Sequence, residues 1–331
     1  MVVGFFRYAA ATTSHAFVCI RTRNASTSIS LSRSYLYVPS ASERMLEKSL
    51  KTPSDVIVYD LEDSVPPGQA DKLNARSRLK AFLQRPDIPE PTRIAVRVND
   101  LTTPFFGDDI AEIVTNPAVR SLVLPKVHSA QDLHHVSRQI HIVTRHVDRP
   151  PISLIPSIES ARALWNIGEI ASWKSEYAEG GGTLSALLFA AEDYCADTSI
   201  IRSRSRQELL YTRSQIVIAA RAFGLSAIDM VCINYQDNEY LEQECRDGRE
   251  LGFSGKQAIH PNQVPIIQSI YVPTSKEIFR AAKILHQMDV AHSSQKGAIG
   301  LEGEMIDAPM IKQAEKTITL AKAAGLEIPT F

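Results

Sequence analysis

Short apolar segments recur along this chain, and each ends in polar or charged residues before a helix-like segment begins. The clearest is Ser185-Ala-Leu-Leu-Phe-Ala-Ala-Glu-Asp-Tyr194, in which six small or apolar residues lead to two adjacent carboxylates. An apolar run without polar alternation is typical of a strand that is buried on both faces, as the strands of parallel sheets are. Such strands, alternating with helices, indicate an α/β fold.

Eight segments of this kind are predicted as strands. They are Ser34–Pro39, Asp55–Asp63, Arg93–Asn99, Arg120–Lys126, Ile152–Pro156, the apolar part of Ser185–Tyr194, Ile228–Ile233 and Phe253–His260. Eight strands that alternate with helices predict a (β/α)8 TIM barrel, whose active site lies at the C-terminal ends of its strands. Polar residues fall at these ends, namely Tyr37, Glu62, Asp63, Arg97, Lys126, Glu159, Asp193 and His260.

Two of the acids suggest a metal site. Glu159 follows the fifth predicted strand, and Asp193 follows the sixth. Two oxygen ligands from two strand ends, with water and substrate at the remaining positions, is how a protein typically holds Mg²⁺. We therefore predict Glu159 and Asp193 as metal ligands, although each acid could instead cap the helix that follows it. The sequence also leaves Mn²⁺ open as the metal.

Arg44, Lys48 and Asp307 each have a simple structural interpretation. Arg44 and Lys48 share one face of a helix that begins at Ser42. Their spacing favours a solvated basic face over a clamp for phosphate groups. Asp307 lies between apolar residues just before the final helix, predicted over Ile311–Ala324, and its simpler role is to cap that helix.

The composition limits both compartment and partners. Residues 1–32 carry several arginines among Ala, Ser, Thr and Phe, and no acid occurs before Glu43. This is typical of a mitochondrial transit peptide, with a disordered cytosolic tail as the alternative. The net charge of −1 argues against nucleic acid as a partner, and no apolar run is long enough to span a membrane. The four cysteines form no C-x-x-C pair, so we expect free thiols.

We expect three parts in the chain: the leader 1–32, a barrel over 33–271, and an extension over 272–331. In the extension we predict a helix over Lys276–Met288 and a polar loop over His292–Gly303. Because the barrel needs no further unit to close, the extension is expected to pack on a neighbouring subunit. No G-x-G-x-x-G or P-loop follows a strand, which removes support for a dehydrogenase or a Walker-type nucleotide site.

An ordered set of motifs runs from about Arg33 to Leu320. It consists of Tyr35-Leu-Tyr-Val-Pro, Tyr59-Asp-Leu-Glu-Asp, Arg97-Val-Asn, Leu124-Pro-Lys-Val, Ile158-Glu-Ser-Ala, Phe189-Ala-Ala-Glu-Asp, Gly255-Lys-Gln-Ala-Ile-His-Pro-Asn-Gln and Met305-Ile-Asp. This set resembles the HpcH/HpaI aldolase and citrate lyase β-subunit-like family.

The resemblance implies roles for individual residues. Glu159 and Asp193 match the family's Mg²⁺ ligands, and Arg97 matches its active-site arginine. Residues that match substrate- or coenzyme A-contacting positions are Tyr37, Arg44, Lys48, Ile259 and His260. Asp307 matches an acid that the C-terminal segment places in the active site of an adjacent subunit of a homotrimer. Glu62 and Asp63 would hold metal-bound water or orient Arg97.

The implied activity is the cleavage of a hydroxyacyl-CoA thioester such as citramalyl-CoA to acetyl-CoA and pyruvate. Asp307 is the candidate that exchanges a proton with the acetyl-CoA carbon. Two departures stand out, because Arg44 replaces a lysine and His128 follows Leu-Pro-Lys-Val where relatives tend to have glutamate. The alternatives are a malyl-CoA or other hydroxyacyl-CoA lyase, a thioesterase, or a catalytically weak binding subunit.

Overall fold

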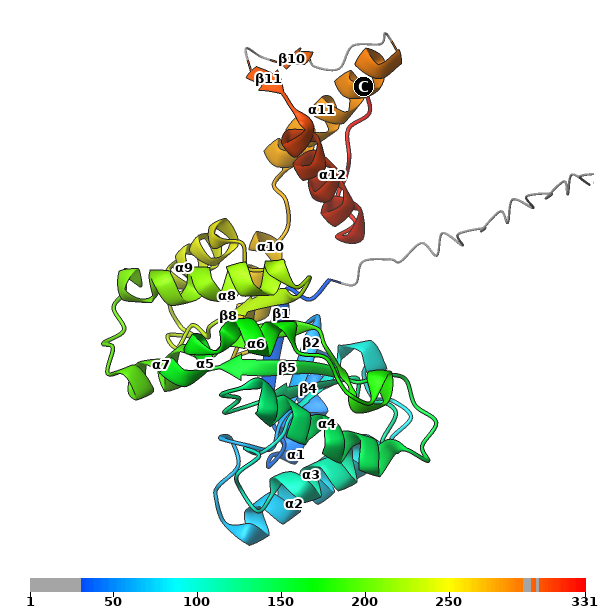
Figure 1. Ribbon diagram of the computed structural model, residues 1–331, viewed down its shortest axis with the longest axis vertical. Helices are drawn as coiled ribbons and strands as arrows, with labels where there is room; N and C mark the ends of the chain where they lie inside the picture. The colour runs from blue at the N-terminus through cyan, green and yellow to red at the C-terminus, as the bar shows by residue number, and fades with distance from the viewer. Residues whose placement is uncertain (1–30, 294–298, 302–303) are drawn as a thin grey trace, which may run out of the picture.

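The computed structural model describes residues 31–293, 299–301 and 304–331. Within residues 31–293, eight parallel strands close into a barrel that helices surround (Figure 1). The strands are β1 (Ser34–Pro39), β2 (Val56–Asp60), β3 (Ile94–Arg97), β4 (Ser121–Leu124), β5 (Ser153–Ile158), β7 (Ala186–Phe189), β8 (Ser226–Asp229) and β9 (Gly255–Ala258). The predicted (β/α)8 barrel is confirmed.

The pairing of the strands shows how the ring closes. β1 pairs with both β2 and β9, and β4 pairs with both β3 and β5. A short additional strand, β6 (Thr183–Leu184), pairs with the start of β5, whereas β7 pairs with its end. β6 and β7 therefore act as one barrel strand that is interrupted at Ser185.

The helices lie on the outside of the barrel and connect successive strands. They are α1 (Glu43–Ser49), α2 (Gln69–Phe82), α3 (Phe106–Ile113), α4 (Ala130–Thr144), α5 (Ala161–Trp165), α6 (Ile167–Ser172), α7 (Ala191–Thr198), α8 (Leu210–Ala222), α9 (Asn238–Leu251) and α10 (Gln263–Ile270), with 3-10 turns η1 (Pro91–Arg93), η2 (Ala178–Gly181) and η3 (Gln207–Leu209). Ser42 starts α1 as predicted, since its side chain accepts a hydrogen bond from the Met45 N–H.

The unbroken apolar runs are explained by two apolar layers. Successive side chains of a strand point to opposite faces, so Val58 and Val123 fill the inside of the barrel. Their neighbours Ile57 and Leu122 belong to the larger core between strands and helices. Because both faces of each strand are covered, apolar residues are favoured at every position.

The C-terminal part forms a separate unit that extends away from the barrel (Figure 1). It contains α11 (Ser275–Ser293), the antiparallel strands β10 (Ile299–Leu301) and β11 (Glu304–Ile306), and α12 (Ala308–Ala323). Its own apolar cluster includes Ile278, Ile284 and Ile318. The prediction of a continuous loop over His292–Gly303 was wrong in part, because β10 lies within it and gains its backbone partners from β11.

Two predictions concern residues that the structure does not describe or describes only in part. The leader 1–32 lies outside the described residues except for Leu31 and Ser32, and Cys19 falls within the undescribed part. Cys195, Cys232 and Cys245 are buried free thiols, as expected. In the described ranges no helix combines the length and apolar character needed to cross a bilayer.

Candidate active site

A pocket of about 440 Å³ opens at the C-terminal ends of the barrel strands. Its lining includes Tyr37 from β1, Asp60 from β2, Arg97 from β3, Asp193 just beyond β7 and Gln257 from β9. The structure thus brings together polar residues that are widely separated in the sequence. Their position follows from the parallel barrel, in which all strands end at the same face.

Arg97 is the centre of an acidic cluster on one side of the pocket. Its Nε and Nη2 donate to the two carboxylate oxygens of Asp60, each at 2.7 Å. Its Nη1 lies 2.8 Å from Glu62 Oε2 and 3.2 Å from Asp63 Oδ2. The guanidinium carbon also lies 4.9 Å from the centre of the Tyr37 ring. One guanidinium is therefore held by three carboxylates and an aromatic face.

Asp60 is a site residue that the sequence analysis missed. It is the last residue of β2, and it pairs in register with Arg97 at the end of β3. The available signal was the run Tyr59-Asp60-Leu61-Glu62-Asp63, but a strand register was needed to choose among its acids. Asp60, rather than Glu62 or Asp63, makes the two-point contact.

Burial raises the pKa of both Asp60 and Glu62, yet their net pKa shifts are opposite. Burial raises the pKa of Asp60, but the charge and hydrogen bonds of Arg97 outweigh it and hold that pKa below its ordinary value. For Glu62, burial is the largest effect, and neighbouring Asp63, Glu159 and Asp60 add to it, so its pKa rises to about 8 despite Arg97. Glu62 Oε2 lies at ion-pair distance from Arg97 but makes no hydrogen bond. Arg97 therefore offsets only part of the rise in the pKa of Glu62.

The predicted metal ligands meet at Lys126, and one of them, Asp193, lines the same pocket as Arg97. The Lys126 ammonium lies 3.0 Å from Glu159 Oε1 and 2.7 Å from Asp193 Oδ1. Glu159 is buried at the end of β5, whereas Asp193 is partly exposed in the first turn of α7. Although burial lowers the pKa of Lys126, the two carboxylates more than offset this and raise it.

Lys126 is the second residue that the sequence analysis left out of the site, although it was recognised at a strand end. Its backbone φ is 53°, a left-handed conformation that is uncommon for residues other than glycine. In this conformation its backbone N–H donates to Glu159 Oε1 at 3.0 Å while its ammonium reaches the same oxygen. A strained backbone that serves two such contacts is a frequent feature of functional sites.

The donor set fits a magnesium ion held by few protein ligands. Glu159 and Asp193 supply two carboxylates that already converge on one positive charge, and Mg²⁺ is typically held by one or two carboxylates plus water and substrate. Among the described residues, no group of three or more His, Cys, Asp or Glu side chains has the arrangement of a metal centre. Two carboxylates suit an oxygen-ligated ion that keeps positions open for water and substrate.

Of the residues predicted to contact substrate or coenzyme A, Tyr37 and Ile259 line the pocket beside Arg97. His260 stacks on Tyr235 with ring centres 5.0 Å apart. Arg44 and Lys48 are exposed on α1. Neither side chain makes a hydrogen bond or an ion pair with another residue in the part of the chain that the structure describes, so the solvated basic face is what the single chain shows.

Asp307 lies in the C-terminal unit and does not line the pocket. Its side chain accepts a hydrogen bond from the Met310 N–H at 3.1 Å and caps α12, which agrees with the simpler interpretation. His128, which replaces an expected acid, shares a hydrogen bond with Ser160 Oγ at 2.8 Å. Ser160 caps α5 directly after Glu159, so His128 supports the backbone beside a predicted metal ligand.

A TIM barrel with carboxylates and an arginine gathered at its strand ends has the architecture of a barrel enzyme. The chain belongs to the HpcH/HpaI aldolase/citrate lyase family, whose model matches residues 33–261.

Similarity extends over most of the chain. It is 34% identical to the human protein named mitochondrial citramalyl-CoA lyase, over 87% of this chain and 85% of that one. It is 33% identical to the citrate lyase subunit beta of Leuconostoc mesenteroides subsp. cremoris, over 89% and 95% of the two chains. A crystal structure of CitE from Mycobacterium tuberculosis with magnesium, acetoacetate and coenzyme A is similar, with 28% identity, a TM-score of 0.68 and coverage of 89% and 98%.

Proposed function

We propose that this chain is a Mg²⁺-dependent carbon–carbon lyase that cleaves a hydroxyacyl-CoA thioester. The preferred substrate is citramalyl-CoA, and the products are acetyl-CoA and pyruvate. The observation that carries the proposal is that Arg97 and Asp193 line one pocket, while Asp193 and Glu159 meet at the Lys126 ammonium. The names of the similar proteins, which include a citramalyl-CoA lyase, support the substrate class.

Glu159 and Asp193 are the residues that would hold the metal ion. Bound Mg²⁺ supplies Lewis-acid polarisation to carboxylate and hydroxyl oxygens of a substrate. Lys126 lies at the same two carboxylates, so its ammonium balances their charge before the ion binds. We propose that Lys126 then turns toward the substrate carboxylate, which carries the opposite charge.

Arg97 is the proposed electrophilic group of the reaction. Cleavage of the C–C bond leaves negative charge on the thioester enolate, and a guanidinium that stays protonated can offset it. The two-point contact with Asp60 fixes the plane of the guanidinium before substrate binds. Glu62 and Asp63 contact its third nitrogen and hold its direction, so the group needs little reorganisation during the reaction.

Binding of the coenzyme A part is assigned to residues at the rim. Tyr37 and Ile259 line the pocket, and His260 lies beside Ile259. Arg44 and Lys48 project from α1, the helix that follows β1, without a protein partner among the described residues. They are therefore free to contact phosphate groups, and the guanidinium of Arg44 can do so through two parallel hydrogen bonds.

We further propose that the chain acts as a homotrimer in which Asp307 enters the pocket of a neighbouring subunit. The C-terminal unit has its own core and extends away from its own barrel (Figure 1). Met305, beside Asp307, is 76% exposed, as expected for a residue that another subunit covers. There Asp307 would exchange the proton at the acetyl-CoA carbon.

We propose a role for each of the three parts of the chain. The barrel over 33–271 carries the pocket, and the extension over 272–331 carries the acid for a neighbour. Residues 1–32 would direct the chain to the mitochondrial matrix, which agrees with the mitochondrial name of the human relative.

A turnover assay with the purified chain tests the proposal. Citramalyl-CoA and malyl-CoA are offered side by side with Mg²⁺, with Mn²⁺ and with EDTA, and products are identified by mass spectrometry. We expect Mg²⁺-dependent release of acetyl-CoA and pyruvate from citramalyl-CoA. Faster cleavage of malyl-CoA would change the substrate. Release of free coenzyme A would indicate a thioesterase, and inactivity on both with metal bound would favour a binding subunit.

A further inference from the structure

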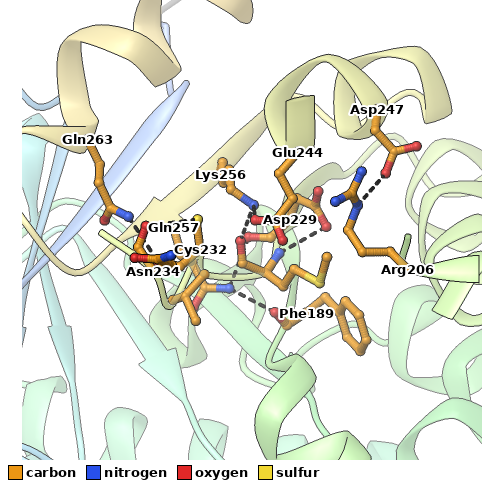
Figure 2. Close-up of polar contacts among 12 residues, drawn as sticks. Phe189, Arg206, Asp229, Cys232, Asn234, Glu244, Asp247, Lys256, Gln257 and Gln263 are labelled. Atoms are coloured by element: carbon orange, nitrogen blue, oxygen red, sulfur yellow. Dashed lines mark hydrogen bonds and ion pairs between the residues drawn. The ribbon is translucent and has the colours of Figure 1, made fainter. Parts of the chain in front are cut away.

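Gln257 is a buried glutamine at the seam where β9 meets β1. It is 3% exposed, and its side chain touches three other strands near the pocket. Its Nε2 donates to the backbone carbonyl of Phe189 at 2.8 Å and to that of Asp229 at 3.0 Å, as Figure 2 shows. Its Oε1 accepts a hydrogen bond from the Tyr37 hydroxyl at 3.1 Å.

These contacts use the groups that distinguish an amide from other side chains of its size. A glutamine offers two N–H donors and one carbonyl acceptor. Both donors are directed at strand carbonyls, and the acceptor receives the phenol. A glutamate at this position would turn an oxygen toward two carbonyl oxygens, and a leucine would leave both carbonyls and the phenol without this partner.

The partners of Gln257 lead to two different groups of site residues. Tyr37 lies under Arg97 and therefore belongs to the side that would stabilise the enolate. Phe189 is the last residue of β7, and the chain then leads through the first turn of α7 to Asp193. Through one amide, the aromatic support of Arg97 is connected to the strand end that places a metal ligand.

The strand that carries Gln257 is held firmly from the outside of the barrel. The neighbouring Lys256 is fully buried, and its ammonium lies 2.9 Å from Glu244 on α9 and donates to the Met230 carbonyl at 2.7 Å (Figure 2). Glu244 in turn pairs with Arg202 at 2.6 Å. Breaking such a buried pair is costly, so β9 is a fixed reference for the residues that Gln257 contacts.

We propose that Gln257 is a positioning residue that sets the geometry between Arg97 and the metal ligand Asp193. This inference rests on the proposed lyase function, in which Arg97 and Asp193 serve the same reaction. Both polar groups of the Gln257 amide are already bonded to protein partners. It acts through Tyr37 on one side and through the Phe189 carbonyl on the other.

The first test is the kinetics of Gln257→Leu, with folding checked by circular dichroism and thermal unfolding. Because misplacement by about 1 Å can cost on the order of 100-fold, we expect kcat to fall about 10- to 100-fold. KM should change by less than about threefold, because the candidate phosphate-binding residues Arg44 and Lys48 are untouched. A kcat within about twofold of wild type in the folded variant would overturn the proposal.

Two further variants give readouts that a loss of stability would not imitate. Gln257→Glu should recover activity relative to wild type as the pH falls, because a protonated carboxyl can donate to one of the two carbonyls. Tyr37→Phe combined with Gln257→Leu should be no slower than Gln257→Leu alone, since both changes remove the same connection. Additive losses, or a pH-independent ratio for Gln257→Glu, would contradict the mechanism.

Gln263 provides a matched control with a different expected outcome. It is fully buried, and its Oε1 accepts hydrogen bonds from the backbone N–H groups of Ile259 and His260 while its Nε2 donates to the Cys232 carbonyl. It holds the rim loop rather than Arg97 or Asp193. Gln263→Leu should therefore raise KM for the thioester and lower kcat less than Gln257→Leu does.

Crystal structures separate a failure of this inference from a failure of the proposed function. If the wild-type chain cleaves neither thioester, the lyase proposal fails, and the structures of wild type and Gln257→Leu decide the positioning role. A shifted Tyr37 ring and Phe189 carbonyl in the variant would support it. Unchanged positions of both would overturn it.

Discussion

Replacement of Arg97 by methionine should destabilise the fold, and the loss should depend on pH. Arg97 is the two-point partner of Asp60, which is only 1% exposed. Removal of the guanidinium leaves that carboxylate with its hydrogen bonds from the Glu62 and Ser64 N–H groups but without a counter-charge. Methionine keeps the length and much of the volume of the side chain, so the change tests charge rather than packing.

The expected loss of unfolding free energy at pH 7.5 is about 3–5 kcal/mol, the usual cost of breaking a buried ion pair by removing one partner. Glu62 should add little to this loss, because its pKa of about 8 already keeps much of it protonated at that pH. Asp63 is 65% exposed and can be solvated by water. The loss therefore comes mainly from Asp60.

The pH dependence follows from the sign of the pKa shift. In the wild type the pKa of Asp60 is held below its ordinary value, so this group stabilises the fold above that value and stops doing so as pH falls through the folded pKa. Without Arg97, burial raises the pKa instead, and the penalty grows with rising pH. The difference between wild type and variant should be largest near neutral pH and shrink toward about pH 4.

Urea unfolding followed by circular dichroism at several pH values measures this difference. The double variant Arg97→Met with Asp60→Asn is the matched control, and it should recover at least about half of the loss because no buried charge remains. A stability of Arg97→Met within about 1 kcal/mol of wild type at pH 7.5, or a loss that does not change with pH, would refute the reasoning.

Three further predictions address the metal pair, the buried acid and the C-terminal unit. Lys126→Met should bind Mg²⁺ about 5- to 30-fold more tightly in calorimetric titrations, because the variant lacks the ammonium that competes for Glu159 and Asp193. The two partly exposed ion pairs of that ammonium contribute about 1–2 kcal/mol together, and weaker binding would contradict this. The raised pKa of Glu62 makes the wild type lose stability as pH rises through about 8. Glu62→Gln should therefore show a smaller decline in melting temperature than the wild type between about pH 5 and pH 8, measured on the metal-free proteins. Parallel curves of melting temperature against pH would count against this. Asp307→Ala and Asp193→Ala should each be inactive alone but regain turnover when the two variants are assembled into mixed trimers. In such a trimer, a site can combine Asp193 from one subunit with Asp307 from its neighbour. No recovery in confirmed mixed trimers would exclude Asp307 as an acid supplied by a neighbour.

The barrel itself could be predicted from the sequence because its signal is local and repeated. Runs such as Val56–Tyr59 and Ala186–Phe189 are apolar at every position, which only strands covered on both faces require. The parallel arrangement then places all strand ends on one face, so the proximity of Glu159 and Asp193 followed from topology alone.

The contacts within the site could not be predicted in this way. Asp60, Glu62 and Asp63 lie within four residues, and only the register of β2 with β3 made Asp60 the two-point partner of Arg97. Lys126 bridges the predicted metal ligands from a left-handed backbone conformation that no local pattern indicates. The sequence predicted only that Gln257 lies in a strand. The closure of β9 on β1 then placed its amide among three other strands. Hydrogen bonding is directional and short-ranged, so these partners were decided by register and side-chain direction, whereas burial and strand order were already determined by the pattern of apolar residues.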